Sequence, residues 1–352
     1  MKTKILYIIS DRNFGGGSRH VFDLITNLDK KRFIPILISI PSPILDRLEG
    51  KIKTYQVEMN SRLDLKAVKK IQSIIEQEKP AIIHLHSTRA GILGTLAAKR
   101  YKLPIIYTEH LFTKEYIPHN KLIHIYQLNA FKYLSKHISK VIAVSNSVKN
   151  YLVDKKIFAP HQVEVIYHGV DTTKFNHLTN ATHHQEIIVG SIGSLHRNKG
   201  FGKLIHAVQE LRNIKLEIIG PGTDMSELKK IDSKGKVKFW DYQENPQKLM
   251  KNWDIYVQYS NFESFGLAIA EAMASGIATI ATNIGGTPEL VGDAGILISP
   301  GNEKSLQNAI MKLANDSKLR IKLGKKAEER IEKYFTIKNM VRKTEELYKK
   351  LL

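Results

Sequence analysis

Cysteine is missing from the 352 residues of the chain. Its absence excludes a disulfide scaffold, thiolate catalysis and a cysteine-bound zinc site, and it fits a reducing cytosol. Long apolar runs are missing too. The first run, Ile5 to Ile9, is too short for a signal-peptide core, and no later stretch approaches a membrane span. We therefore expect a soluble, cytoplasmic protein.

Three short motifs with known chemistry are also missing. No Asp-x-Asp occurs, so Mg²⁺ or Mn²⁺ bridging a diphosphate has no obvious carboxylate ligands, and we expect neither a metal nor a cofactor. The glycine run NFGGGSR matches neither G-x-G-x-x-G nor the P-loop pattern, which argues against nicotinamide or P-loop binding. Its glycines, Gly15, Gly16 and Gly17, would still let the backbone approach a ligand closely. A tight βα turn would look the same.

Basic residues, in contrast, are in excess. The formal net charge is +20, and +14 of it falls in residues 1–170. This excess indicates anionic partners, such as phosphate groups, nucleic acid or an anionic membrane surface. A solvated lysine-rich surface explains it equally well. Nucleic acid is not expected as a partner, because the chain has no recognised nucleic-acid-binding motif and no basic residues interleaved with aromatic ones.

The order of apolar segments predicts two α/β domains in tandem. Short β-branched runs alternate with longer amphipathic stretches, which is typical of parallel sheets covered by helices. Strands are predicted at 4–10, 35–40, 81–86, 105–109, 141–145 and 163–167, and again at 187–193, 215–220, 237–240, 255–259, 278–282 and 296–299. The polar stretch His168–Gln185 between the two series is interpreted as a linker. Ligands are expected at the carboxyl ends of the strands.

These signals predict an N-terminal Rossmann-like domain over residues 1–168 and a C-terminal one over residues 186–334. The last segment, Lys325 to Leu352, has a helical pattern. We expect its residues 335–352 to pack back on the first domain.

The most informative segment is NFESFGLAIAEAMASG, residues 261–276, directly after a predicted strand. A helix is expected to start near Ser264 to Gly266. The free amides of Phe265, Gly266 and Leu267 would then form a helix N-terminus suited to a diphosphate.

Two glutamates flank that helix start. Glu271 lies four to five residues into the helix, about 6–8 Å along its axis, which would suit a ribose diol accepted by the carboxylate. Glu263, on the other side of the turn, would face the attached sugar. Both could be ordinary surface residues. However, Glu271 is embedded in the apolar run GLAIAEAMA, where a carboxylate needs a polar partner.

A second segment, GSLHRNKG, follows the predicted strand that begins at Ile187. A strand, Gly193, Ser194, a basic loop and then a helix form the layout of an anion site at a strand end. Arg197 and Lys199 could supply the charge that stabilises a departing nucleoside diphosphate, although solvated loop charges would look similar. His110 also falls at a strand end, where a histidine is more often structural than catalytic unless a cleft places it opposite Glu263.

Together these segments resemble the family 4 retaining glycosyltransferases of the GT-B fold (glycosyl transferases group 1) over nearly the whole chain. The matching parts are FGGGSRHVFDL, VIYHGVD, GSLHRNKG, the pair Glu263 and Glu271 in an E-x7-E spacing, and ATNIGGTPELV. The resemblance implies two Rossmann-like domains facing across a cleft. It also implies transfer of a sugar from a nucleotide sugar, with retained anomeric configuration and no essential metal.

The resemblance further implies a role for each matching residue. Glu271 would hold the donor ribose, Glu263 would contact the donor sugar, and Lys199 would contact the diphosphate. The loop Gly15–Gly17 would face the phosphate and the acceptor, and His110 would lie near the transferred sugar.

Two positions depart from the family pattern. Ser194 stands where the family commonly has an arginine, a role that Arg197 could take from within the same loop. His168 stands where the linker motif usually has asparagine. Neither departure touches the E-x7-E element.

The predicted function is therefore that of a hexosyltransferase that uses a nucleotide sugar, with UDP favoured, and a glycan or lipid-linked acceptor of cell-surface polysaccharide or glycoconjugate synthesis. A GT-B enzyme such as a sugar-nucleotide epimerase, or a basic nucleic-acid-binding protein, is the alternative. The charge of the first half and the lysine-bearing amphipathic stretch His119–Lys140 favour a peripheral position on an anionic membrane. That stretch could equally pack its apolar face on the domain core.

Overall fold

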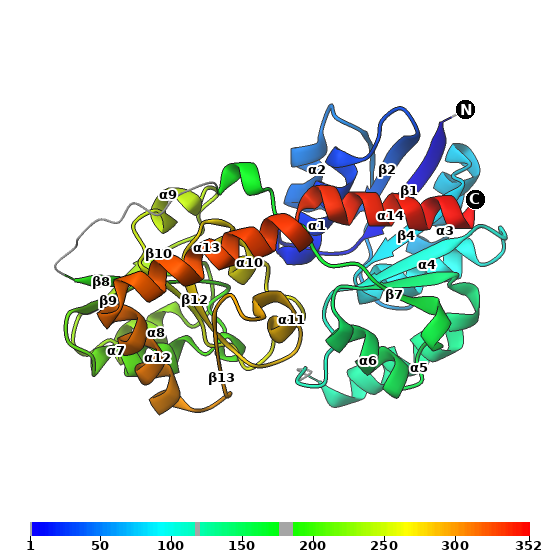
Figure 1. Cartoon of the computed structure of the whole chain (residues 1–352). Coiled ribbons are helices and arrows are strands. Elements are labelled where there is room, and N and C mark those ends of the chain that lie inside the picture. Colours follow the sequence, from blue (N-terminus) through cyan, green and yellow to red (C-terminus); the bar gives the residue numbers. More distant parts are fainter. Residues whose placement is uncertain (1, 117–119, 176–185) are drawn as a thin grey trace. The chain divides into compact units, whose positions relative to one another are not determined.

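The computed structural model describes residues 2–116, 120–175 and 186–352, and it divides into two compact units. One unit comprises Met1–Gly169 together with Ile337–Leu352, and the other comprises Val170–Thr336. Each unit is a parallel sheet with helices on both faces (Figure 1). The predicted α/β class is thereby confirmed. Most of the stretch interpreted as a linker, residues 176–185, lies outside the described residues.

The sheet of the first unit has seven parallel strands in the order β3-β2-β1-β4-β5-β6-β7. Their bounds are β1 Thr3–Ile9, β2 Phe33–Ser39, β3 Lys53–Gln56, β4 Ile82–His86, β5 Ile105–Glu109, β6 Lys140–Ala143 and β7 Val163–Val165. The central strands β4 and β5 are buried along their whole length. Because helices cover both faces, neither strand has the alternating exposure of a half-buried strand, and the polar residues in IIHLH and IIYTE are buried as well. The strand order reverses between β1 and β4.

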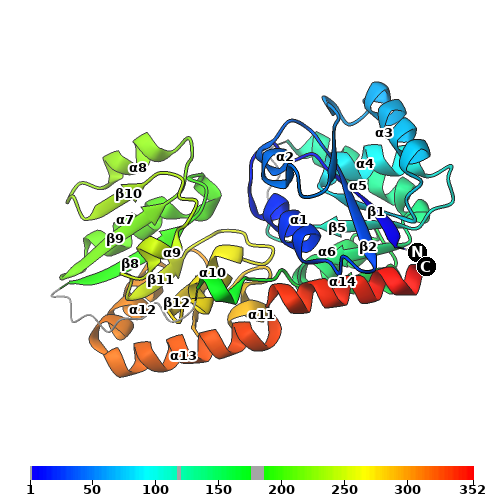
Figure 2. The same cartoon turned by 90° about the horizontal axis from the view of Figure 1, so that it is seen from above.

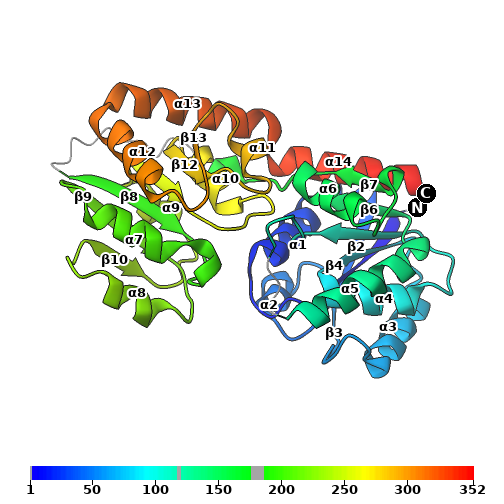
Figure 3. The same cartoon turned by 90° about the horizontal axis from the view of Figure 1, so that it is seen from below.

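The helices of the first unit form two layers. The unit contains α1 Gly16–Asn27, α2 Pro43–Leu48, α3 Leu65–Glu78, α4 Thr88–Ala98, α5 Lys121–Leu134, α6 Asn146–Asp154 and α14 Ile337–Leu351, with 3₁₀ turns at Ser135–His137 and Pro160–Gln162. Helices α1, α2 and α14 share one apolar core with β1 (Figure 2). Helices α3, α4 and α5 lie beside one another on the other face (Figure 3).

The last helix, α14, is built into the core of the first unit. Met340, Val341 and Leu347 pack among the side chains of α1 and β1. The buried hydroxyl of Tyr348 lies 2.8 Å from that of Tyr7 on β1. Helix α14 therefore completes the apolar core formed by β1 and α1.

The sheet of the second unit has six parallel strands in the order β10-β9-β8-β11-β12-β13. Their bounds are β8 Ile187–Ile192, β9 Ile214–Ile219, β10 Val237–Trp240, β11 Ile255–Gln258, β12 Ala278–Thr282 and β13 Ile296–Ile298. The helices are α7 Phe201–Gln209, α8 Met225–Ile231, α9 Gln247–Met250, α10 Leu267–Ala274, α11 Thr287–Val291, α12 Glu303–Asn315 and α13 Ser317–Tyr334, with 3₁₀ turns at Thr172–Lys174 and Arg197–Lys199. Helices α7, α8 and α12 pack on one core.

Two elements differ from the prediction. The helical segment expected from Lys325 to the C-terminus is interrupted after Tyr334, because Phe335 and Thr336 leave the helical conformation. There the backbone NH of Val170 donates to the carbonyl of Phe335 at 2.8 Å, and Val170 forms a parallel bridge with Thr336. The edge strand β3 was not predicted.

Within the described ranges, every helix falls short of the length or the apolarity that crossing a bilayer requires.

Candidate active site

The strand order of the second unit reverses between β8 and β11, so the loops after these neighbouring strands lie side by side at the carboxyl edge of the sheet. Doubly wound sheets bind ligands at such a point. The loop after β8 carries Lys199, and the loop after β11 carries Glu263. The backbone NH of Asn261 donates to the carbonyl of Asn198 at 2.8 Å and ties the two loops together.

Lys199 and Glu263 form an ion pair at this point, with 2.5 Å between Nζ and Oε1. Their side chains are 22% and 11% exposed, so water screens the pair less than it would at an open surface. Ser260 donates a further hydrogen bond to the same carboxylate oxygen at 3.1 Å. The ammonium thus has a fixed position and still reaches solvent, where an entering anion can contact it.

Three polar side chains on β11 and its extension support Glu263. The hydroxyl of Tyr256 donates to Gln258 Oε1 at 2.5 Å, and Gln258 Nε2 donates to Ser260 Oγ at 2.8 Å. They share one face because they alternate along the strand. Burial, reinforced by the charges of Glu263 and Glu271, raises the pKa of Tyr256 well above its ordinary value, so the phenol keeps its proton. These three supporting residues were not predicted. The sequence does indicate them, because Tyr256, Gln258 and Ser260 place a polar group at every second position of an otherwise apolar strand.

Two glycines let the backbone pass close to the ion pair. Gly200 has a φ of +69° and Gly285 a φ of +51°. A Cβ on Gly200 would collide with the carbonyl oxygen of Tyr259, and a Cβ on Gly285 would collide with that of Glu263. The carbonyl of Glu263 also accepts a hydrogen bond from Gly286 at 3.1 Å. The segment Gly285–Gly286 therefore packs directly on the carbonyl of Glu263.

Helix α10 follows the Glu263 loop directly. It begins at Leu267 with Gly266 as its N-cap, slightly later than predicted, and Gly266 has a φ of +97°. The ring of Phe265 is buried and lies 5.7 Å from that of Phe335, which anchors the helix start in the core. Glu271, the fifth helical residue, is 6% exposed. Free amides and a buried carboxylate thus lie about one turn apart on a single element.

The other residues of the basic loop differ in how close they lie to the Lys199–Glu263 pair. Gly193 borders the Lys199 stem, because a Cβ built on it would lie 3.7 Å from Lys199 Cδ. Ser194 is exposed. The side chain of Arg197 is 88% exposed and lies 3.9 Å from Glu227. The described contacts therefore join Lys199 to Glu263 but do not bring Arg197 to that pair.

In the first unit, the glycine run forms the start of α1. Gly15 is the N-cap and Gly16 is the first helical residue. Added Cβ atoms on these two would meet nothing within 4 Å, whereas one on Gly17 would lie 2.8 Å from Asp11 Oδ2. Close packing therefore requires glycine only at Gly17, and the other two leave the helix N-terminus open.

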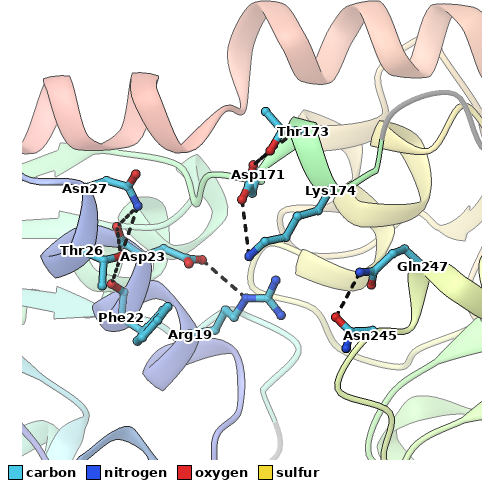
Figure 4. Close-up of polar contacts among 10 residues, drawn as sticks. All are labelled: Arg19, Phe22, Asp23, Thr26, Asn27, Asp171, Thr173, Lys174, Asn245 and Gln247. Carbon is cyan, nitrogen blue, oxygen red and sulfur yellow. Dashed lines mark hydrogen bonds and ion pairs between the residues drawn. The ribbon is translucent and has the colours of Figure 1, made fainter. Parts of the chain in front are cut away.

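Figure 4 shows two basic residues that lie near acidic ones of their own unit. In α1, Arg19 Nε lies 3.6 Å from Asp23 Oδ2, and Asn27 Nδ2 donates to the Asp23 carbonyl at 2.8 Å. In the second unit, Lys174 Nζ lies 3.4 Å from Asp171 Oδ2. Acidic groups thus partly offset both charges, as Glu227 does for the more exposed Arg197.

His110 follows β5 and lies among other histidines. Its Nε2 lies 3.2 Å from His86 Nδ1, and its Nδ1 lies 3.4 Å from His168 Nε2. Burial, together with the neighbouring His168 and His86, lowers the pKa of His110 well below its ordinary value. It is therefore a neutral imidazole at pH 7, and its place beside a transferred sugar stays a prediction. His168, expected at the start of a linker, is buried in this unit.

Two family models match the chain. The model described as Glycosyltransferase Family 4 matches residues 14–174, and that described as Glycosyl transferases group 1 matches residues 173–330. The capsular polysaccharide biosynthesis glycosyltransferase CapM of Staphylococcus aureus is 26% identical over 312 residues, which cover 82% of this chain and 82% of CapM. The UDP-Gal:alpha-D-GlcNAc-diphosphoundecaprenol alpha-1,3-galactosyltransferase of Escherichia coli is 26% identical over 93% of this chain and 91% of its own.

Solved structures show the same architecture. A glycosyltransferase from Rickettsia africae superimposes with a TM-score of 0.85 at 23% identity, covering 99% of this chain and 98% of its own. Alr3699/HepE from Anabaena, crystallised with UDP and glucose, gives 0.84 at 20% identity, covering 99% of both chains. Consecutive family models over residues 14–330 and a GT-B fold identify the chain as a member of the family 4 glycosyltransferases (glycosyl transferases group 1), which are enzymes that use nucleotide sugars.

Proposed function

We propose that the enzyme transfers a hexose from a UDP-sugar to a lipid-linked glycan acceptor, with retention of configuration, in the synthesis of a cell-surface polysaccharide or glycoconjugate. The observation that carries this proposal is the Lys199–Glu263 pair at the switch point of the second sheet. The similarity to the Escherichia coli galactosyltransferase, which acts on a diphosphoundecaprenol carrier, supports the acceptor class. The similarity to CapM, a glycosyltransferase of capsular polysaccharide biosynthesis, supports the role in polysaccharide synthesis. The UDP of the Anabaena structure supports the donor.

The second unit would bind the donor through three groups in sequence. The amides that begin α10 and the ammonium of Lys199 would bind the diphosphate, and Glu271, about one turn into the helix, would accept the ribose hydroxyls. Glu263 would orient the sugar. As the sugar leaves, negative charge grows on the diphosphate, and a fixed ammonium stabilises that charge without having to reorganise.

The acceptor side of the proposal rests on α5 in the first unit. Phe131 and Leu134 are buried and hold the helix on the unit, whereas Leu122 and Ile125 are 78% and 55% exposed. The apolar residues of this stretch therefore do not all pack on the core, which favours the membrane alternative over the structural one. His119, where the predicted stretch begins, lies outside the described residues.

The exposed apolar side chains continue beyond α5 and have lysines beside them. A groove of about 490 Å³ is lined by Ser61, Arg62, Leu63, Leu122, Ile123 and Tyr126. Lys121, Lys132 and Lys136 are exposed on or next to the same helix. Apolar residues that enter the headgroup region, with lysines that meet anionic lipid, would hold a peripheral enzyme beside its lipid-linked acceptor.

A donor panel tests the proposal. Thermal unfolding is measured with UDP, GDP and ADP and with their sugar conjugates, each at about 100 times its Kd, where binding stabilises by roughly 2.7 kcal/mol. UDP and one UDP-hexose should raise the unfolding temperature, and that donor should yield a glycosylated undecaprenyl-diphosphate acceptor. Stabilisation by GDP or ADP alone would contradict the donor assignment. Conversion of the UDP-sugar to an epimer without transfer would contradict the reaction.

A further inference from the structure

Four histidines of the first unit meet at the carboxyl edge of its sheet. His20 comes from α1, His86 ends β4, His110 follows β5 and His168 follows β7. His20, His86 and His168 are buried, and His110 is half-buried. Strands β1 and β4, between which the strand order reverses, lead into two of the contributing segments. A binding site is expected at this edge of a doubly wound sheet.

The ring nitrogens of these histidines form a chain of short contacts. His20 Nδ1 lies 3.1 Å from His168 Nδ1, His168 Nε2 lies 3.4 Å from His110 Nδ1, and His110 Nε2 lies 3.2 Å from His86 Nδ1. The chain ends at His20 Nε2 and His86 Nε2, which are buried and have no hydrogen-bond partner among the described residues. Buried ring nitrogens without a partner are costly, and each such group calls for a cause.

A fifth histidine shows what a purely structural position looks like in the same sheet. His84 lies two residues before His86 on β4. Its Nδ1 lies 2.6 Å from the hydroxyl of Tyr348, and its Nε2 lies 2.7 Å from Thr108 Oγ1. Both of its nitrogens are used, so the unpartnered nitrogens of His20 and His86 are not a general result of burying histidine here.

We propose that His20, His86 and His110 form a binding site for one divalent transition-metal ion of the Zn²⁺ class, with the fourth position open to water. One nitrogen from each ring lies within 4.8 Å of those of the other two. A tetrahedral zinc site with bonds of about 2.0–2.1 Å needs nitrogens about 3.3 Å apart. His86 Nδ1 and His110 Nε2, at 3.2 Å, already have that spacing, and His20 must approach by up to roughly 1.5 Å. Of the two unpartnered nitrogens, His20 Nε2 would then be a ligand, whereas His86 would bind through Nδ1.

The distances between the ring centres agree with a common metal centre. Imidazoles that radiate from one zinc ion place their ring centres about 5 Å apart. The ring centres lie 5.0 Å apart for His20 and His110, 5.5 Å for His86 and His110, and 5.7 Å for His20 and His86. His168, in contact with His20 and His110, would accept the second N–H of one of these ligands and so orient it, because a neutral imidazole has one acceptor nitrogen.

The donor set decides which metal ion such a site would select. Three imidazoles without a carboxylate select Zn²⁺, Cu²⁺ or Ni²⁺ over Mg²⁺ or Ca²⁺. This site belongs to the first unit, whereas the proposed diphosphate ligands belong to the second. An experiment can therefore disprove Zn²⁺ binding while the use of a UDP-sugar stands, and the reverse.

The test uses the full chain without a histidine tag, stripped with a chelator and dialysed. Zn²⁺ is titrated in by calorimetry at pH 7. We expect one equivalent to bind, and the substitutions His20→Gln and His86→Gln each to weaken binding at least about tenfold, since even outer-shell losses cost 10–100-fold. His161→Gln and His206→Gln, at exposed histidines, are the matched controls and should bind like the wild type.

Binding that is absent in the wild type, or equally strong in the wild type, His20→Gln and His86→Gln, would overturn the proposal. Circular dichroism checks the fold of each variant. If a variant does not fold, the visible absorption of the wild type with Co²⁺ still tests the proposal. Co²⁺ should give the intense visible absorption of a tetrahedral site, whereas the weak spectrum of aqueous Co²⁺ would contradict it.

Discussion

The ammonium of Lys199 and the carboxylate of Glu263 are 2.5 Å apart although 64 residues separate them in the chain. The contact exists because β8 and β11 are neighbours in the sheet, so the loops after them share one edge. Because both side chains are largely covered, the pair holds the ammonium in place before an anion arrives. Lys199 can share its charge between Glu263 and the diphosphate without leaving this position.

Lys199→Ala should lower kcat more than it raises KM, because the ammonium matters most as the diphosphate departs. A loss of about 10²–10³-fold in kcat is expected, which is the range for removing one fixed transition-state donor. Steady-state kinetics with varied donor separate the two constants. A variant whose KM rises while kcat is unchanged would show that Lys199 only binds the donor.

Arg197→Ala provides the comparison from the same loop. If Arg197 replaces the arginine missing at Ser194, its loss should also lower kcat, but by only about tenfold, since an exposed side chain must be ordered before it can act. The same kinetic assay measures the effect. Full activity of Arg197→Ala would restrict the diphosphate site to Lys199 and the amides of α10.

Glu271→Ala should weaken UDP binding by roughly 10- to 100-fold, the value of charge-assisted hydrogen bonds to ribose, and nearly abolish transfer. Calorimetry with UDP measures the affinity, and circular dichroism checks the fold. Glu271→Gln is the matched variant, because it keeps the shape of the side chain but loses the charge and replaces one acceptor oxygen by an NH2 donor. Unchanged UDP affinity in a folded Glu271→Ala would remove Glu271 from the site.

Activity in excess EDTA should equal activity in Mg²⁺. The chain has no Asp-x-Asp, and lysine and helix amides are available to neutralise the diphosphate. Initial rates with EDTA, Mg²⁺ and Mn²⁺ provide the measurement. Loss on chelation that Mg²⁺ or Mn²⁺ restores would contradict a metal-free diphosphate site. Loss that only Zn²⁺ restores would point instead to the histidines of the first unit.

Most of the strands could be predicted because they are buried on both faces and therefore appear as β-branched runs. β11 and β12 began at the predicted residues, Ile255 and Ala278. β3 could not be predicted in this way. Its sequence KTYQ is polar and only partly buried at the sheet edge, so it has no hydrophobic signal and depends on pairing with β2. The break after Tyr334 has the same kind of cause, because it depends on pairing with a segment more than 160 residues away.

The candidate site could be predicted residue by residue but not as an arrangement. Lys199 and Glu263 each followed a predicted strand, yet only the strand order makes them partners. The histidine cluster was harder to predict, since His20, His86 and His168 come from three separate elements. No spacing in the sequence indicates that these elements converge.

Membrane binding should require anionic lipid and should weaken with salt. Exposed lysines near an anionic leaflet contribute on the order of 1 kcal/mol each, and salt screens that attraction. Leu122 and Ile125, which are exposed on α5, would add apolar contact with the headgroup region. Co-sedimentation with liposomes, with and without anionic lipid and at low and high salt, measures the binding.

Two variants separate the electrostatic part of that binding from the apolar part. Changing Lys121, Lys132 and Lys136 to Glu should abolish binding to anionic liposomes at low salt, where the electrostatic part dominates. Leu122→Ser with Ile125→Ser should leave binding at low salt but remove the part that survives high salt, because that part depends on apolar insertion. Changing Lys229 and Lys230 on α8 of the second unit to Glu is the control and should have little effect. If the wild type stays in the supernatant with anionic liposomes even at low salt, α5 does not bind membranes and a soluble acceptor becomes the better hypothesis.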